Sequence, residues 1–308
     1  MRVGVVDLGT NSTRLLVADV KDGRVDEVVR RTEITRLGEG VDERRKLLPL
    51  PIARVRNVLT DYRRELEGLG AERTLAVATS AVRDAENGEA FLGEIEWSYG
   101  FATQLLSGGD EASLTLRGVS EGRTVDPGTL VLDVGGGSTE LITEGFATSL
   151  DLGCVRLTER FLGSDPPTRE ELDACAAAVW HALPPLSPSS AIGVAGTITS
   201  LAALDLELAE YDPERVHGHR LSHKAVEDHL THLASLPLAE RRELPPLEPE
   251  RAPVIVAGAV IVGEVLARYG LDAIEASERD LLDGAAHAAA ALPPPEEGDA
   301  PPGAYTCC

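Results

Sequence analysis

The sequence has little of several things that would mark a specialised class of protein. Only four cysteines occur among 308 residues, and Cys154, Cys175, Cys307 and Cys308 have the spacing of neither a zinc site nor a disulfide framework. No apolar run approaches the roughly 20 residues of a membrane-spanning helix. The chain opens on a strand-like run at residues 3–6, without the basic region or cleavage site of a signal peptide. These absences predict a cytoplasmic protein.

Basic residues are also scarce. The 29 Lys and Arg residues stand against 51 Asp and Glu residues, which gives a formal net charge of −22. Binding to nucleic acid requires a basic face that neutralises phosphates, so the composition argues against nucleic acid as a partner. A polyanionic substrate would likewise need a locally positive cleft. The length of the chain favours two domains.

One pattern occurs twice. Residues 5–16 read VVDLGTNSTRLL, and residues 131–142 read VLDVGGGSTELI. Both contain two apolar residues, an Asp, a turn with Gly, then Ser-Thr and two further apolar residues. Each copy is typical of a strand, a tight turn and a second strand. The repetition predicts two duplicated lobes.

The composition of both turns is suited to phosphate. Glycine lets the backbone approach a ligand closely, and turn N–H groups and hydroxyls can form a concave nest for an anion. An Asp at the end of the first strand is well placed to hold Mg²⁺ against the same phosphate. For one copy alone, an ordinary hairpin is the alternative. Asp7 and Asp133 at the same offset in both copies favour the phosphate interpretation.

Strands and helices alternate along the rest of the chain, which is typical of the α/β class. The pattern predicts an N-terminal lobe at 1–122, a C-terminal lobe at 123–292 whose last helix could pack back on the first lobe, and a disordered Pro/Gly-rich tail at 293–308. Further strands are expected at 25–33, 74–79, 102–106, 147–152, 191–194 and 272–276. Helices are expected from Pro51 to Gly70, after Asn87, at 169–183 and at 279–292.

Three further clusters follow strands, and ligands of parallel α/β sheets collect outside the carboxyl ends of strands. The segment TSAVRDAEN contains Arg83, LLSGGDEA contains Asp110 and Glu111, and GVAGT at 193–197 leads into a helix whose first N–H groups favour anions. Each has a plainer alternative. Arg83 could be a surface arginine, the two acids could serve only the helix dipole, and strand-Gly-helix turns are common.

A histidine-rich segment, 217–232, has the composition of a metal cluster. We interpret it as a loop followed by a solvated helix with Val226, Leu230 and Leu233 facing the core. No acid or thiol completes a ligand set of the usual spacing.

The motifs DLGTNSTR from Asp7, TSAxR ending at Arg83, SGxxEA ending at Ala112 and DxGGGSTE ending at Glu140 together resemble the exopolyphosphatase/guanosine pentaphosphate phosphatase (Ppx/GppA) family over residues 1–292. The resemblance implies two ribonuclease-H-like lobes of the actin/Hsp70/sugar kinase superfamily with a central cleft. It also implies dependence on Mg²⁺, or Mn²⁺, and removal of terminal phosphate. A homodimer is a further expectation. Longer members add a C-terminal HD-like domain, so the chain resembles the short form.

The resemblance implies a role for each matching residue. Glu111 is expected to activate the attacking water and Arg83 to clamp phosphate charge, while Asp133 and Glu140 hold the metal. The residues expected to bind phosphate are Asp7, Gly9, Thr10, Asn11, Ser12, Arg14, Gly135, Gly136, Gly137, Ser138, Thr139, Gly196 and Thr197. Where the family often has Gly-Leu-Arg-Glu-Gly, residues 280–284 read DLLDG. Loss of that arginine favours shorter polyphosphate chains.

The sequence leaves several functions open. The leading hypothesis is an exopolyphosphatase, and a guanosine pentaphosphate 5′-phosphohydrolase shares every motif quoted. A nucleotide-dependent kinase of the same superfamily would use residues 193–197 to hold adenosine, but Glu111 in a short Ser-Gly turn argues against it. A catalytically silent phosphate or alarmone sensor is a third class. The intact Glu111, Asp133 and Glu140 argue against that class.

Overall fold

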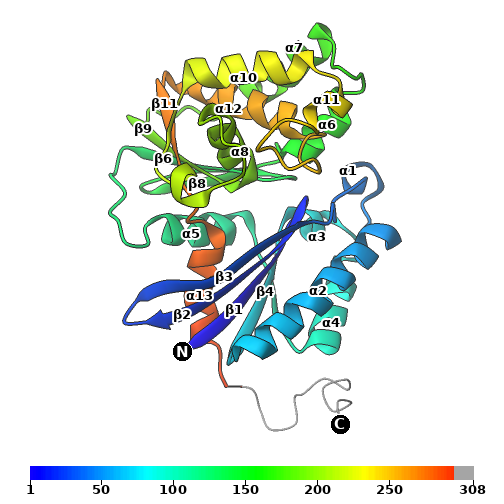
Figure 1. The fold of residues 1–308 in the computed structure, drawn as a ribbon, viewed down its shortest axis with the longest axis vertical. Helices are drawn as coiled ribbons and strands as arrows, with labels where there is room; N and C mark the ends of the chain where they lie inside the picture. Colours follow the sequence, from blue (N-terminus) through cyan, green and yellow to red (C-terminus); the bar gives the residue numbers. More distant parts are fainter. Residues whose placement is uncertain (295–308) are drawn as a thin grey trace. The chain divides into compact units, whose positions relative to one another are not determined.

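The computed structural model describes residues 1–294, and the chain forms two compact units (Figure 1). The first contains Met1–Arg123 and the chain from Leu281 onward, and the second contains Thr124–Asp280. The last helix therefore belongs to the first unit, and the second unit ends at Asp280 instead of residue 292. Apart from its first two residues, the predicted tail at 293–308 lies outside the described residues.

The first unit is built on a five-stranded sheet with the order β3-β2-β1-β4-β5. Its strands are β1 (Arg2–Leu8), β2 (Ser12–Lys21), β3 (Arg24–Ile34), β4 (Arg73–Ala78) and β5 (Ala102–Leu105). Strand β2 is antiparallel to both of its neighbours, β1 and β3, and β4 and β5 run parallel to β1. Its helices are α1 (Val41–Arg44), α2 (Pro49–Leu69), α3 (Ser80–Asp84), α4 (Gly88–Tyr99), α5 (Gly108–Val119) and α13 (Leu281–Ala291).

Alternating side chains of β1 form two separate cores in this unit, as expected for a strand buried on both faces. Val6 and Leu8 pack in a cluster with residues of α2 and α4, whereas Val3 and Val5 pack with α13. Helix α2 has proline in its first turn and ends at Gly70, whose φ of 72° supplies the left-handed C-cap.

The cap predicted at Asn87 is a partial exception. Asn87 does occupy the N-cap position of α4, but its side chain makes no capping bond. Instead, its amide oxygen accepts from the Leu47 N–H at 2.8 Å and its amide nitrogen donates to the Leu47 carbonyl at 3.1 Å. The residue therefore fastens the preceding loop to the helix start.

The second unit contains a six-stranded sheet with the order β10-β11-β9-β6-β7-β8. Its strands are β6 (Thr129–Val134), β7 (Thr139–Thr143), β8 (Phe146–Leu150), β9 (Ser190–Val194), β10 (Arg220–Ser222) and β11 (Ala273–Ala276). Its helices are α6 (Cys154–Phe161), α7 (Arg169–Ala182), α8 (Ala195–Asp205), α9 (Pro213–Val216), α10 (His223–Ser235), α11 (Leu238–Arg241) and α12 (Ile255–Tyr269). Helix α12 is apolar on most sides and contributes the largest share of the core around it.

The two sheets repeat one plan. In each, an antiparallel meander of three strands is followed by two parallel strands that add beside its first strand: β1-β2-β3 with β4 and β5, and β6-β7-β8 with β9 and β11. The predicted α/β fold with two ribonuclease-H-like sheets is therefore confirmed, and β10 is an addition at one edge of the second sheet.

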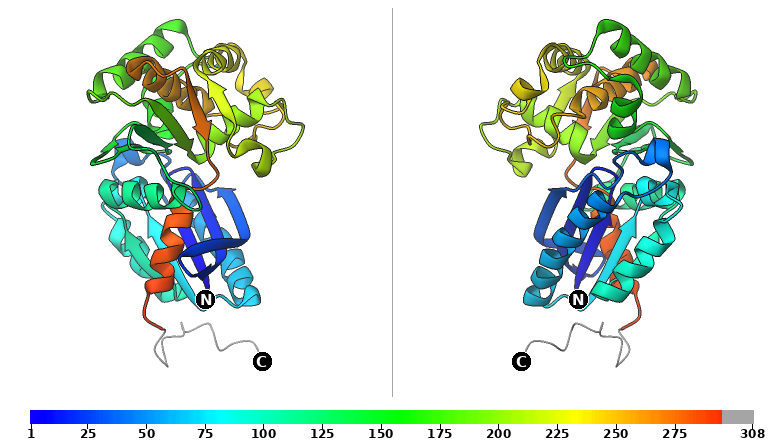
Figure 2. Two further views of the ribbon diagram at one scale, coloured as in Figure 1. Left: turned by 90° about the vertical axis from the view of Figure 1, so that its left-hand side faces the viewer. Right: turned by 90° about the vertical axis from the view of Figure 1, so that its right-hand side faces the viewer.

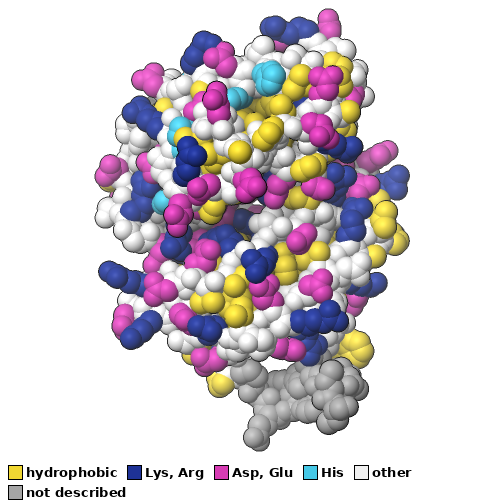
Figure 3. Space-filling view, viewed as in Figure 1, with side chains coloured by type: hydrophobic (Ala, Val, Ile, Leu, Met, Phe, Trp, Pro, Cys, Tyr) yellow, Lys and Arg dark blue, Asp and Glu magenta, His cyan; other side chains and the backbone are white. Residues whose placement is uncertain are grey.

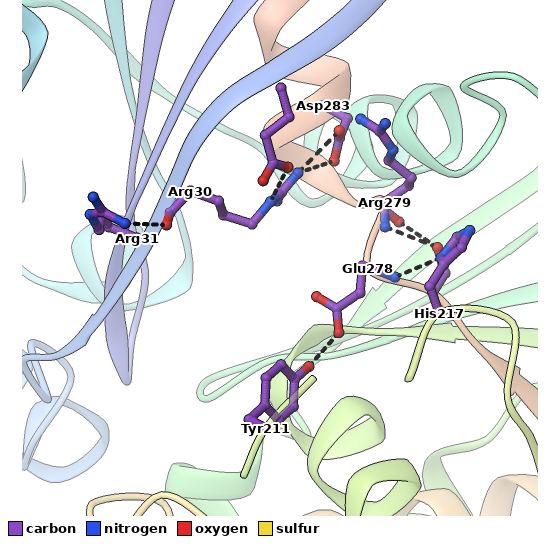
Figure 4. A network of polar contacts seen from close by, with 9 residues as sticks. Arg30, Arg31, Tyr211, His217, Glu278, Arg279 and Asp283 are labelled. Atoms are coloured by element: carbon purple, nitrogen blue, oxygen red, sulfur yellow. Dashed lines mark hydrogen bonds and ion pairs between the residues drawn. The ribbon is translucent and has the colours of Figure 1, made fainter. Parts of the chain in front are cut away.

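Helix α13 completes the first unit and packs against α5 (Figure 2). A Cβ atom added to Gly284 would meet the Leu114 carbonyl oxygen at 1.9 Å, so the close approach of the two helices requires glycine there. The fully buried Asp283 accepts two hydrogen bonds from the guanidinium of Arg30, at 3.0 and 3.1 Å (Figure 4). These contacts fix α13 against both β3 and α5.

On the face in Figure 3, Lys and Arg side chains are interspersed with Asp and Glu side chains. A local positive charge for an anionic ligand must therefore come from particular residues, because the net charge is −22. Among residues 1–294, no helix combines the length and the apolar character needed to cross a lipid bilayer.

Candidate active site

In the first unit, three strands end side by side and bring the predicted residues to one edge of the sheet. The pairing of β1 with β4 extends to Leu8 opposite Ala78, and that of β4 with β5 extends to Ala78 opposite Leu105. The segments that follow these strand ends are the first Gly turn, α3 with Arg83 and the start of α5 with Glu111. Sequence segments far apart are thus neighbours here because the strands are parallel.

Arg83 and Glu111 contact each other directly. The Arg83 Nη1 atom donates to Glu111 Oε2 at 2.9 Å and to the Leu106 carbonyl at 2.8 Å. The Glu111 side chain is only 6% exposed, whereas that of Arg83 is 28% exposed. The guanidinium therefore fixes the direction of a buried carboxylate. Both residues stand in motifs of the sequence, but no sequence pattern indicated their contact.

The neighbouring acid, Asp110, has a different task. Its carboxylate accepts from the Ser107 N–H at 3.0 Å and from the Ser107 hydroxyl at 2.6 Å, and its own N–H donates to the Ser107 hydroxyl at 3.2 Å. This is a complete capping box at the start of α5. The two adjacent acids are therefore separated into an exposed helix cap and a buried, ion-paired carboxylate.

The carbonyl groups of the first Gly turn accept hydrogen bonds from nearby backbone N–H groups. The Gly9 N–H donates to the Ser12 carbonyl at 3.0 Å and closes the turn. The Thr10 carbonyl accepts from the Gly38 N–H at 2.8 Å, and the Asn11 carbonyl accepts from two N–H groups of residues 35–36. The N–H groups of Thr10 and Asn11 donate to no acceptor within residues 1–294. They are therefore the groups that remain for a ligand.

The second turn is built in the same way, with α6 as its support. The Gly135 N–H donates to the Ser138 carbonyl at 3.0 Å. The carbonyls of Gly135 and Gly136 accept from the N–H groups of Cys154 and Val155 at 3.0 and 2.9 Å. These donors belong to the first turn of a helix, where N–H groups have no partner within the helix itself.

Arg156 completes this support. Its Nε atom donates to the Gly137 carbonyl at 2.7 Å, and the residue is only 6% exposed. A Cβ added to Gly153 would lie 2.1 Å from the Gly136 carbonyl oxygen, so the close contact of α6 with the turn requires glycine at 153. No sequence pattern indicated α6 or Arg156, because their link to the turn is made only by the folded chain.

In both turns the carbonyl groups are hydrogen-bonded within the chain, whereas several N–H groups are left for a ligand. In the second turn, the N–H groups of Gly136, Gly137 and Ser138 have no acceptor among the residues that the structure describes. Convergent N–H groups of this kind form an anion-binding nest. In the first turn, the side-chain oxygen of Asn11 is buried and also lacks a hydrogen-bond partner within the described chain. A buried polar atom of this kind indicates a place for a ligand or water.

The proposed metal ligands lie opposite each other. Asp133 on β6 and Glu140 on β7 are register partners, so their side chains project from the same face of the sheet. Glu140 accepts a 2.7 Å hydrogen bond from the Ser149 hydroxyl, which orients its carboxylate. Mg²⁺ is commonly bound by one or two carboxylates together with water and substrate phosphate, and this pair fits that requirement. Within residues 1–294, no group of three or more His, Cys, Asp or Glu residues could hold a metal ion by itself.

Two predicted phosphate ligands have side chains that are engaged inside the second unit. The Thr139 hydroxyl donates to the Leu152 carbonyl and is fully buried. The Thr197 side chain packs against Gly258, and the residue is only 5% exposed. The Thr139 hydroxyl is therefore used inside the second unit, and the backbone groups of both residues remain for an anion.

Gly196 is in close contact with Arg251, a residue from a distant part of the sequence. A Cβ at this position would lie 1.7 Å from the Nη1 atom of Arg251, so the guanidinium rests directly on the glycine backbone at the start of α8. Arg251 pairs with Glu248 through its Nε atom, and its side chain is 18% exposed. It brings a cation to the edge where β6 and β9 end. Because Arg251 and Gly196 are far apart in the sequence, no local pattern indicated that they meet.

The histidine-rich segment forms a structural cluster. His219 and His229 both contact the carboxylate of Asp205 through their Nε2 atoms, at 2.7 and 3.3 Å. The predicted helix is α10, and Val226 and Leu233 are fully buried on its inner face. His217 accepts a hydrogen bond from the Glu278 N–H, and Glu278 bonds with the hydroxyl of Tyr211 (Figure 4). These contacts fasten elements of the second unit to one another.

Comparison with known proteins identifies the family. The model of the Ppx/GppA phosphatase family matches residues 16–288. Exopolyphosphatase 2 of Mycobacterium tuberculosis is 39% identical over an alignment that covers 92% of this chain and 97% of that protein. Among solved structures, an exopolyphosphatase-like protein has a TM-score of 0.85 at 34% identity, with coverage of 92% and 97%. The Ppx/GppA phosphatase of Aquifex aeolicus has a TM-score of 0.73 at 32% identity, with coverage of 94% and 99%. The chain belongs to the Ppx/GppA phosphatase family.

Proposed function

We propose that this protein is an exopolyphosphatase that releases terminal orthophosphate from inorganic polyphosphate, with Glu111 as the base that activates water. Family membership makes the chain a phosphoanhydride hydrolase. The choice of polyphosphate is supported by the likeness to the M. tuberculosis protein named exopolyphosphatase 2. The observation that carries the mechanism is the buried Glu111 carboxylate, held by Arg83 at the same sheet edge as the first nest.

The reaction assigned to these residues is a simple displacement. Glu111 accepts a proton from water, and the oxygen of that water forms a bond to the terminal phosphorus. The bond between that phosphorus and the bridging oxygen breaks, so that orthophosphate and a polyphosphate shorter by one unit are released. Phosphoryl transfer of this kind depends mainly on positioning and on neutralisation of charge. The N–H groups of the first nest, which lies at the same sheet edge as Glu111, supply neutralisation without a mobile side chain.

Arg83 acts through Glu111 in this proposal. Its 2.9 Å contact fixes the direction of the carboxylate, which a base requires before it can accept a proton from water. The partly exposed remainder of the guanidinium can also face phosphate oxygens, as expected from the sequence.

Asp133 and Glu140 are the residues that would hold Mg²⁺ or Mn²⁺. When bound, the ion would neutralise phosphate charge and so favour attack by an anionic nucleophile. The pair is suited to a metal that keeps several of its waters, because within residues 1–294 no third His, Cys, Asp or Glu completes a metal-binding group with it.

Guanosine pentaphosphate is the second candidate substrate, since the family includes both activities. One feature bears on chain length within the first candidate. Leu282, which stands where the resemblance expects an arginine, is fully buried in the core around α13. It contributes neither charge nor hydrogen bonds to a polyanion. This supports a preference for shorter polyphosphate chains.

The test is a panel assay of phosphate release from short polyphosphate, long polyphosphate, guanosine pentaphosphate and ATP. The Glu111→Gln variant, purified in parallel, controls for contaminating phosphatases. We expect release from polyphosphate, fastest with short chains, and none above the control with ATP. Hydrolysis of guanosine pentaphosphate alone would replace the first candidate with the second, and transfer of phosphate to an acceptor would overturn both.

A further inference from the structure

The two duplicated hairpins place matching residues in a row across each sheet. Each row crosses four neighbouring strands and consists of residues that are register partners in turn. The first row is Thr32, Arg14, Asp7 and Val77, and the second is Ser149, Glu140, Asp133 and Val194. Register partners have side chains on the same face of a sheet. The rows therefore agree in chemistry at the hydroxyl, the aspartate and the valine, and they differ only at the position of Arg14 and Glu140.

At that position, the first row contains the positively charged side chain of Arg14. The Nε and Nη2 atoms of Arg14 both lie 2.8 Å from Oδ2 of Asp7. The side chains are 17% and 6% exposed, so the ion pair is largely shielded from water. A planar guanidinium with two nitrogens at one carboxylate is a strongly oriented contact.

The second row has a carboxylate where the first has this guanidinium. Glu140 is 3% exposed, lies opposite Asp133 and is oriented by the Ser149 hydroxyl. Two carboxylates directly opposite one another can supply oxygen ligands to one divalent cation. The same sheet frame thus supports a built-in cation in one copy and an oxygen pair in the other.

We propose that Arg14 is an internal substitute for a metal ion: it occupies at Asp7 the place that a divalent cation occupies at Asp133. The protein then binds one divalent cation per chain, at the second hairpin only. The identity of residue 14 sets this number, because the frames are otherwise equivalent. The inference rests on the metal ligands of the proposed function, Asp133 and Glu140.

Three substitutions test this assignment. Arg14→Glu recreates in the first row the carboxylate pair of the second, and it should add a cation site. Arg14→Gln removes the guanidinium without adding a carboxylate, so it is the matched control. Glu140→Arg gives the second row the composition of the first and should remove the existing site.

The measurement is the number of Mn²⁺ ions bound by the full chain, obtained from the electron paramagnetic resonance signal of free Mn²⁺ during titration. Circular dichroism and the melting temperature verify that each variant is folded. We expect one ion for the unmodified protein, two for Arg14→Glu, one for Arg14→Gln and none for Glu140→Arg. This readout does not depend on turnover.

Several results would overturn the assignment. Two ions bound by the unmodified protein would show that Arg14 does not exclude metal from the first hairpin. One ion bound by a folded Arg14→Glu variant would show that residue 14 does not set the number. If Arg14→Glu fails to fold, an ion retained by Glu140→Arg decides against the proposal. No ion bound by the unmodified protein would also overturn it, whereas phosphate release by the same preparation reports separately on the hydrolase function.

Discussion

Arg83 donates from one nitrogen to both the Glu111 carboxylate and the Leu106 carbonyl, so the proposed base is fixed to the end of β5 by an arginine from another helix. This contact changes the interpretation of Arg83. As a pure phosphate clamp it would affect mainly substrate binding, whereas a partner of Glu111 should affect turnover as well. The contact also separates Glu111 from the adjacent Asp110, which bonds only within its helix cap.

Glu111→Gln should abolish turnover while substrate binding persists. Glutamine keeps the shape of the side chain but cannot accept the proton of water, and loss of a general base typically lowers the rate about 10²–10⁴-fold. The nests remain intact, so the affinity for polyphosphate should be retained. Rates of phosphate release and calorimetric binding of polyphosphate to the variant check both parts. Turnover near that of the unmodified protein would place the base elsewhere.

Asp110→Asn is the matched control for this variant, and it should affect stability instead of turnover. Hydrogen bonds from Ser107 lower the pKa of the Asp110 carboxyl. A carboxyl whose pKa is lowered by folding stabilises the protein above its unfolded pKa, and this contribution is lost as the pH falls through the folded value. The variant should therefore be less stable at neutral pH, by about 0.5–1 kcal/mol, and the difference should shrink as the pH falls below about 4. Urea unfolding at pH 7 and pH 3 measures it. A dead Asp110→Asn with an active Glu111→Gln would reverse the two assignments.

Arg83→Ala should lower kcat and also destabilise the fold. Its loss leaves the buried Glu111 carboxylate without this donor, which costs about 1–3 kcal/mol. The double variant Arg83→Ala/Glu111→Gln should then be no less active than Glu111→Gln, and more stable than the sum of the single effects implies. Steady-state kinetics and thermal unfolding of all three variants give this cycle. Additive effects would mean that the two residues act independently.

Gly153→Ala should weaken phosphate binding strongly, although residue 153 is remote in sequence from the triglycine turn. The added Cβ would lie 2.1 Å from the Gly136 carbonyl oxygen, so α6 or the turn must move. The exposed Gly93 in α4 has open space around its Cβ position and serves as the control. Gly93→Ala should stabilise the protein by about 0.5–1 kcal/mol with unchanged activity. An unchanged KM for Gly153→Ala would show that the turn does not depend on α6.

Native Cys154 and Cys175 should resist alkylation at pH 8. Burial raises the pKa of Cys154 to about 11 and that of Cys175 to about 12. The reactive thiolate therefore makes up only about one thousandth of Cys154 at this pH. Mass-spectrometric peptide mapping after iodoacetamide treatment, with and without denaturant, checks the expectation. Rapid modification of either residue in the folded protein would contradict it.

The elements that the sequence predicts well are those with local signals. Two hairpins, the helix closed by Gly70 and the strands after it could be read from periodicity, glycine and proline, and their ends agree with the structure within a few residues. Helix α6 left no comparable signal, since it is eight residues long and its main partners lie about 20 positions earlier. Helix α12 also gave none, because it is buried on nearly every side and shows little alternation of polar and apolar residues.

The residues of the candidate site also divide into those that a local motif predicts and those that only the fold brings together. The turns, Arg83, Glu111 and the two carboxylates follow from motif and offset. Arg156 and Arg251 do not, since each reaches the site by a contact that only the fold creates. The Thr139 hydroxyl, which stands in a phosphate-like motif, donates to the Leu152 carbonyl, a contact that the motif does not indicate.

Helix α13 gives the chain a particular order of folding during synthesis. The first unit is interrupted by the whole of the second, because Leu281, Leu282 and three alanines of α13 fill a core begun by Val3 and Val5. A ribosome therefore produces every residue of the second unit before it produces the last part of the first. The second unit can fold as soon as residue 280 has emerged, while one face of the first sheet stays exposed until α13 follows. Protection of that apolar face in the nascent chain then depends on the synthesis of α13.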